Sequence, residues 1–142
     1  MFGVITALVS GALMSIQGVF NTDVTKQTSL WVSASFVQLT ALLVCLAAWL
    51  ICDRTSFRSL FEISDKYVLL GGVIGAFITA TVIWSMDGLG PAKAAMLIVI
   101  SQLTVAWLIE LAGIFGMEKQ PFSMRKLLGL LIAAAGVITF EL

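Results

Sequence analysis

The chain has 142 residues, of which 60% are hydrophobic and only 11% are charged, whereas soluble domains carry about 25% charged residues. Eight Lys and Arg balance eight Asp and Glu, so the chain lacks the excess of clustered cations that nucleic-acid binding requires. The composition therefore excludes an ordinary soluble domain, argues against a nucleic-acid partner and predicts a protein of the lipid bilayer.

Five apolar runs long enough to cross a bilayer follow one another along the chain. They cover residues 2–20, 30–52, 67–86, 91–115 and 124–140. Polar segments or turns separate these runs, and none has the short alternating pattern of a transmembrane β-strand. We predict an all-α membrane protein, a bundle of five transmembrane helices that forms a single domain over residues 1–142.

The first run has no cationic segment before it and is about as long as a span, so we expect it to be retained rather than cleaved as a signal peptide. Small residues recur in it every fourth position, namely Gly3, Ala7, Gly11 and Ser15. This spacing lets helix backbones approach closely in a membrane. We expect the stripe to pack mainly within the chain.

Polar side chains interrupt several of the predicted spans. The first ends with Gln17 and Asn21, the second contains Gln38, and the fourth contains Gln102. At 1.5 Å of rise per residue, Gln38 and Gln102 lie near the bilayer midplane and Gln17 lies between the midplane and the outer face. Any one amide is more often a hydrogen-bonding link between helices, worth about 0.6–2 kcal/mol. The set together predicts a polar cavity that binds a solute, with Trp84 as a flat apolar wall.

Glu110 is a carboxylate inside the fourth predicted span, about four residues from its end. A charge near the centre of a membrane helix costs roughly 2.5–3.5 kcal/mol on insertion scales. We predict that Glu110 is the ionisable partner of the solute site and couples transport to a proton. The alternative is a side chain that extends toward the interface.

No cofactor or metal site is expected, because histidine is absent and the only two cysteines, Cys45 and Cys52, form no metal-binding motif. Their separation along a helix, about 10 Å, is also too long for a disulfide bond between them. A nucleophile–base pair is lacking as well, so we predict that the protein is not an enzyme.

Five spans would place the two termini on opposite sides of the membrane. The N-terminal side would carry six of the eight cations, Arg54, Arg58, Lys66, Lys119, Arg125 and Lys126, and the opposite side would carry Lys26 and Lys93. Cytoplasmic loops are enriched in Lys and Arg. We therefore predict a cytoplasmic N-terminus and an external C-terminus.

Four stretches carry a resemblance to the YdcZ-type family of the drug/metabolite transporter superfamily. They are SIQGVFN at 15–21, GGVIGAFITATVIWSMDGLGPAKA at 71–94, SQLTVAWLIELAGIFG at 101–116 and FSMRKLLGLLIAAAGVITF at 122–140. The family pattern has a Gln followed by an Asn at the end of the first helix, which matches Gln17 and Asn21. It also has a Gln followed by an acid on the fourth helix, which matches Gln102 and Glu110.

The chain departs from the family pattern on the fourth helix. Family members commonly have Gly before the Gln and an Asp–His pair further along, where this chain has Ser101, Glu110 and Leu111. The resemblance implies a half-size transporter of the inner membrane, one repeat of a fold whose larger relatives have two inverted five-helix repeats. Such a unit requires a second copy, or a homologue, inserted the other way up.

The leading hypothesis is therefore alternating-access transport of a small organic solute by an antiparallel homodimer or heterodimer. Gln17, Asn21, Gln38, Trp84 and Gln102 would contact the solute. The first alternative is a non-transporting membrane subunit that assembles with or stabilises another membrane protein. The second is a pore, but the spans contain no ring of charge that would select ions.

Overall fold

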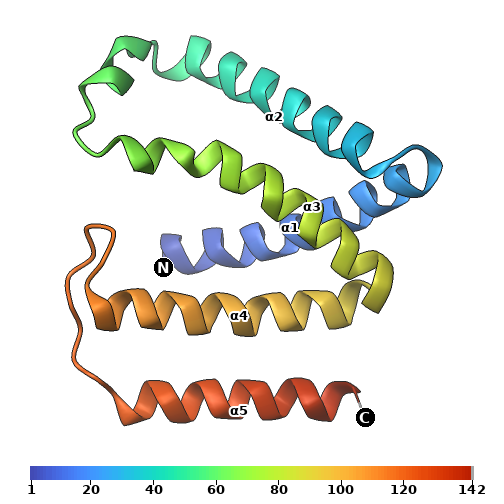
Figure 1. The fold of residues 1–142 in the computed structure, drawn as a ribbon, viewed down its shortest axis with the longest axis vertical. Coiled ribbons are helices and arrows are strands. Elements are labelled where there is room, and N and C mark those ends of the chain that lie inside the picture. The colour runs from blue at the N-terminus through green and yellow to red at the C-terminus, as the bar shows by residue number, and fades with distance from the viewer. Residues whose placement is uncertain (142) are drawn as a thin grey trace. The chain divides into compact units, whose positions relative to one another are not determined.

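The structure is a computed structural model, and it describes residues 1–141 as an all-helical chain (Figure 1). Its α-helices are α1 (Phe2–Gln27), α2 (Leu30–Cys52), α3 (Gly71–Leu89), α4 (Pro91–Ala112) and α5 (Met124–Glu141). Two short 3₁₀ helices, Phe57–Glu62 and Lys66–Leu70, lie between α2 and α3. The predictions of an all-α fold and of five helices are confirmed.

Contacts group the chain into two compact units. The first unit is Met1–Asp87 and contains α1, α2 and nearly all of α3, and the second is Gly88–Leu142, whose described part contains α4 and α5. Each unit is described by itself below. The single domain expected for residues 1–142 stays a prediction.

Helix α1 is longer than the apolar run predicted, because the polar segment 21–27 continues the helix to Gln27. This segment contains neither Gly nor Pro, and its side chains support helical geometry. Gln27 Nε2 donates to Asp23 Oδ2 at 3.1 Å, and the Thr28 hydroxyl donates to the Val24 carbonyl at 2.7 Å. The predicted end at residue 20 was therefore the end of the apolar run and not the end of the helix.

Helix α4 begins at Pro91, as predicted, but ends at Ala112 instead of residue 115. Gly113 adopts the left-handed conformation with φ 65°, and its N–H donates to the Ile109 carbonyl at 2.9 Å. A glycine in this conformation is a common helix C-terminus because it has no Cβ to strain. The earlier end places Glu110 in the last turn of α4.

The segment between α2 and α3 folds back on the end of α2. The indole N–H of Trp49 donates to the Thr55 carbonyl at 2.8 Å, and its ring packs on Phe57 with 4.8 Å between centroids. Aromatic pairs at this separation are favourable. The longest predicted loop is therefore partly ordered by contacts with the helix before it.

The first unit has a small core where α1 ends, α2 begins and α3 ends. Its buried residues are Gly18, Asn21 and Thr22 from α1, Ser33 and Ala34 from α2, and Ala80, Ile83 and Met86 from α3. Gly18 leaves space for the end of Met86, because a Cβ there would lie 2.5 Å from both Sδ and Cε of Met86. The absence of a side chain gives the end of Met86 from α3 room against α1.

The small-residue stripe of α1 leaves two of its glycines without a close neighbour in the first unit. No heavy atom of the described residues lies within 4 Å of a Cβ built at Gly3 or Gly11, beyond their own helix backbone and chain neighbours. The same holds for Gly129 and Gly136 on α5. Within its own unit each of these positions therefore has an open surface, and packing of the α1 stripe within the chain stays a prediction.

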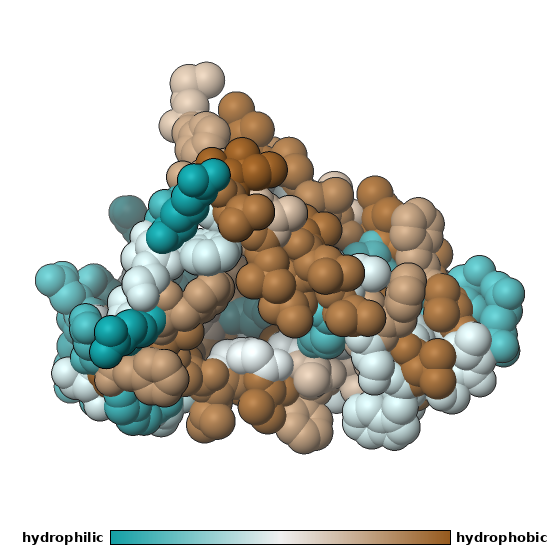
Figure 2. All heavy atoms as spheres, turned by 90° about the horizontal axis from the view of Figure 1, so that it is seen from above, coloured by the Kyte–Doolittle hydropathy of each residue, from teal (hydrophilic) through white to brown (hydrophobic). Residues whose placement is uncertain are grey.

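Four helical segments among the described residues are long and apolar enough to cross a membrane: Phe2–Gln27, Leu30–Cys52, Lys66–Leu89 and Pro91–Ala112. Figure 2 shows hydrophobic side chains over the middle of the visible face and hydrophilic side chains toward its left and right sides. Helix α5 has 18 residues but begins with charged Arg125 and Lys126. The fifth span stays a prediction.

Candidate functional site

A groove of about 530 Å³ runs between α1 and α2, and two predicted solute residues, Gln17 and Asn21, line it. Most of the lining is apolar, with Ser33 and Thr40 as further polar groups on α2. Gln17 and Asn21 are four residues apart and therefore lie one above the other on one face of α1. The spacing that predicted a shared site does bring these two residues to one groove.

A second groove, of about 640 Å³, follows the surface of α1. Its described lining runs from Ile5 to Asn21 and again includes Gln17. Thr6 and Ser10 add hydroxyl groups further toward the N-terminus. Gln17 and Asn21 thus lie where both grooves meet, with apolar surface extending along α1 on one side and toward α2 on the other.

Asn21 is held in place by a bond between helices. It is 7% exposed, and its backbone carbonyl accepts a hydrogen bond of 3.0 Å from the hydroxyl of Ser33, which is fully buried on α2. Buried polar groups need such partners because leaving them unpaired costs about 1–3 kcal/mol. This bond fixes the register of α1 against α2 at the groove.

The same bond explains an unpaired hydroxyl on α1. Thr25 Oγ1 is buried and has no hydrogen-bond partner among the described residues. Other hydroxyls on this helix donate to the carbonyl four residues earlier, as Thr22 does to Gly18 at 2.8 Å. For Thr25 that carbonyl belongs to Asn21, and Ser33 already donates to it. A carbonyl that also accepts its helical N–H has no further lone pair to offer.

Gln38 and Trp84 lie elsewhere in the first unit. Gln38 is partly buried against α3, with its Nε2 3.8 Å from a Cβ built at Gly75. Trp84 is 60% exposed, whereas its neighbour Ile83 is 1% exposed, so Trp84 points away from the core of the unit. Within the described residues, neither side chain lines the two grooves that contain Gln17.

Gln102 belongs to the second unit and is exposed on α4. Its amide is therefore free to face a partner outside that unit. The role predicted for it in solute binding stays a prediction, as do the roles of Gln38 and Trp84.

Glu110 forms an ion pair with Lys126 in the first turn of α5. Its backbone carbonyl also accepts a 2.8 Å hydrogen bond from the N–H of Gln120, which lies in the connection between the two helices. An acid in the last turn of a helix and a base in the first turn each interact unfavourably with the helix dipole. The ion pair between them offsets this unfavourable interaction. Glu110 thus links α4 to the start of α5 through its side chain and to the connection between them through its backbone carbonyl.

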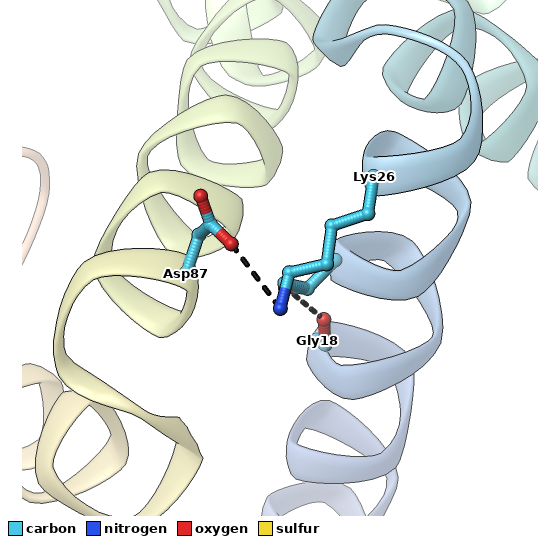
Figure 3. Close-up of polar contacts among 4 residues, drawn as sticks. Gly18, Lys26 and Asp87 are labelled. Carbon is cyan, nitrogen blue, oxygen red and sulfur yellow. Dashed lines mark hydrogen bonds and ion pairs between the residues drawn. The ribbon is translucent and has the colours of Figure 1, made fainter.

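A second ion pair, which the sequence analysis did not foresee, joins α1 and α3 near their C-terminal ends. Lys26 Nζ lies 3.4 Å from Asp87 Oδ1, and both side chains are more than half exposed (Figure 3). Figure 3 also shows the carbonyl of Gly18, which accepts the Thr22 hydroxyl bond within α1. Exposed pairs contribute about 0–1 kcal/mol, so this pair adds little to the packing of Met86 against Gly18.

Comparison with known families decides the class of the protein. Residues 2–139 match the family described as "Putative inner membrane exporter, YdcZ". The chain belongs to this YdcZ family of drug/metabolite transporters. A YdcZ chain is a membrane exporter rather than an enzyme, and its membrane is the inner membrane. No curated protein and no solved structure matches the chain.

Proposed function

We propose that this chain is a half-size transporter that exports a small organic solute by alternating access, as an antiparallel dimer with a second copy or a homologue. The observation that carries the proposal is the position of Gln17, an exposed amide on an apolar groove of a candidate span. An amide that faces hydrocarbon without a partner costs several kcal/mol. A second half-transporter, a solute or water must therefore cover it.

The small core supports a dimer as the working unit. Among residues 1–140, the buried hydrophobic side chains are Ala34, Ala80, Ile83, Met86 and Ala94. Lipid can cover exposed apolar side chains, but the open surfaces at Gly3 and Gly136 are shaped for close contact with another helix. Two such chains inserted in opposite orientations would form the inverted repeats typical of secondary transporters.

The solute would lie between amides and apolar walls. In the proposed dimer, Gln17 and Asn21 contact it from α1, and Gln38, Trp84 and Gln102 contact it from the other helices. The groove lining implies a solute with both hydrogen-bonding and apolar parts. Trp84 adds a cation–π contact if the solute carries a positive charge.

Glu110 remains our candidate for proton coupling, now through its ion pair. Protonation of its carboxylate would leave the ammonium of Lys126 without its partner and would loosen the link between α4 and α5. Such a change in one link is the kind of local event that biases a two-state transporter.

We expect Gln17→Leu to reduce export at least tenfold, because it removes a hydrogen-bonding group that is worth about 1.5 kcal/mol or more in a desolvated site. The measurement compares the small molecules that accumulate in the medium of cells expressing the wild type, the variant or no transporter. Gln27→Leu is the matched control, since it makes the same change on the same helix outside both grooves.

Export would be rejected if the medium of wild-type cells accumulates the same small molecules, in the same amounts, as the medium of cells without the transporter. The protein would then be a subunit that assembles with or stabilises another membrane protein. If Gln27→Leu reduces export as strongly as Gln17→Leu does, the solute contacts lie outside these grooves.

The proposed orientation has five spans, a cytoplasmic N-terminus and an external C-terminus. A reporter that works only in the cytoplasm should therefore be silent when fused after Leu142, and a reporter that works only outside should be active. A cytoplasmic signal alone would reject the external C-terminus. Equal signals from both reporters would show that the chain inserts both ways and forms its antiparallel dimer from identical copies.

A further inference from the structure

The ion pair between Glu110 and Lys126 lies between two cavities of the second unit. On one side is an apolar groove of about 330 Å³, lined by Leu103, Trp107 and Leu130 among others. On the other is a pocket of about 390 Å³ in the connection between α4 and α5. Both charged residues line both cavities, so the two form one amphipathic cleft.

The cleft lies at the end of a candidate span. The groove follows α4 from Glu110 back to Leu103, which is about 10 Å along the helix. The pocket lies beyond the last turn of that helix, among residues of the polar connection such as Glu118 and Gln120. A ligand that fills the cleft therefore needs a polar head at the membrane surface and an apolar chain directed into the bilayer.

The charges of the pocket restrict the head. Its lining carries two carboxylates, Glu110 and Glu118, and one ammonium, Lys126. Glu110 already pairs with Lys126, so Glu118 is the carboxylate available to a ligand cation. Lys126 has three N–H donors and keeps some of them for a ligand anion. This set favours a head with both charges over a purely anionic head.

Trp107 adds a donor at the wall of the groove. Its indole N–H is buried and has no hydrogen-bond partner among the described residues, while its ring packs on Phe122 with 5.6 Å between centroids. Buried indole N–H groups usually find an acceptor, and tryptophan is typical of the membrane interface for this reason. An ester or phosphate oxygen of a bound lipid would supply that acceptor.

We propose that the cleft between α4 and α5 binds one zwitterionic phospholipid, with the head charges found in phosphatidylethanolamine and phosphatidylcholine. Its ammonium contacts Glu118, its phosphate contacts Lys126, and one acyl chain occupies the groove beside Leu103 and Leu130. The site does not depend on the proposed transport function, because it is built within the second unit alone.

The test uses the purified full-length chain in nanodiscs that contain equal amounts of phosphatidylethanolamine, phosphatidylglycerol and phosphatidylcholine. Native mass spectrometry then measures which lipid stays bound after the disc is removed. We expect phosphatidylethanolamine to exceed phosphatidylglycerol at least fivefold. Glu118→Gln should remove this preference, and Glu62→Gln, which changes an acid of the first unit, should preserve it.

A second variant tests the groove without changing a charge. Gly129 lines the groove, and a Cβ there meets nothing within 4 Å, so Gly129→Leu can fill the space without a clash inside the unit. It should lower the amount of bound lipid severalfold. Gly136→Leu, which also meets open space but lies outside the groove lining, should not.

Equal retention of the three lipids by the wild type would overturn the proposal. So would an unchanged preference in Glu118→Gln. If Gly129→Leu dissociates a dimer and leaves lipid retention unchanged, the groove is an interface between protein chains, and the lipid assignment is wrong.

Discussion

Replacing Gly18 with Leu should destabilise the first unit by about 1–3 kcal/mol, the usual cost of overpacking a filled core. A Cβ at Gly18 would lie 2.5 Å from two atoms of Met86 and 3.3 Å from Val82 Cγ1. Met86 is 6% exposed and the nearby Ile83 is 1% exposed, so the larger side chain has little space to enter. The change should separate α1 from α3 and lower the midpoint of thermal unfolding measured in one detergent.

Smaller and distant changes provide the controls. Gly18→Ala should cost less, because the clashing atoms are the flexible end of Met86 and can move. Gly11→Leu should leave the midpoint nearly unchanged, since a Cβ at Gly11 meets nothing within 4 Å. An equal loss of stability at Gly11 and Gly18 would show that the contact with Met86 does not determine the effect, since Gly→Leu raises helix propensity at both positions.

Hydrophobic run length predicted the helices but not all of their ends. Helix α2 has the predicted bounds, and α4 starts at Pro91, where the missing N–H of proline suits the first turn. The end of α1 was missed because polarity marks the edge of the bilayer, whereas a helix continues into water until its hydrogen bonding is interrupted. Gly113 was the available signal for the end of α4, as a glycine that directly follows the apolar periodicity.

The sequence predicted which residues of the candidate site lie together only for residues on the same helix. Gln17 and Asn21 share a face through their spacing of four residues, and the structure places both on the same groove. The faces of Gln38 and Trp84 were not predictable, because helices that are apolar all round give no periodic signal of which side is inward. The bond from Ser33 to the Asn21 carbonyl involves a backbone acceptor that no residue type could reveal.

The partner of Glu110 also lay outside sequence reasoning. Its pairing with Lys126 depends on where α4 ends and on a connection that brings the start of α5 back beside it. With the helix end assigned three residues too late, Glu110 lay further inside the span than the structure places it. The structure thus changes the question from why a charge lies in a membrane helix to what its ion pair does.

Glu110→Gln should abolish the pH dependence of export, because the amide keeps the shape of the protonated acid but can no longer gain or lose a proton. The measurement is the rate at which the exported solute appears in the medium at mildly acidic and mildly alkaline pH. Stability should change little, since the pair is partly exposed, with side-chain exposures of 49% for Lys126 and 36% for Glu110, and such pairs contribute about 0–1 kcal/mol.

Lys126→Gln is the variant that separates coupling from helix linkage. Both substitutions break the same ion pair, so a purely structural link predicts that they have the same effect on export and on its pH profile. Proton coupling at Glu110 predicts a difference: Lys126→Gln keeps the carboxylate and should leave export dependent on pH, whereas Glu110→Gln should not. Identical profiles for the two variants and the wild type would assign Glu110 to the link between α4 and α5 alone.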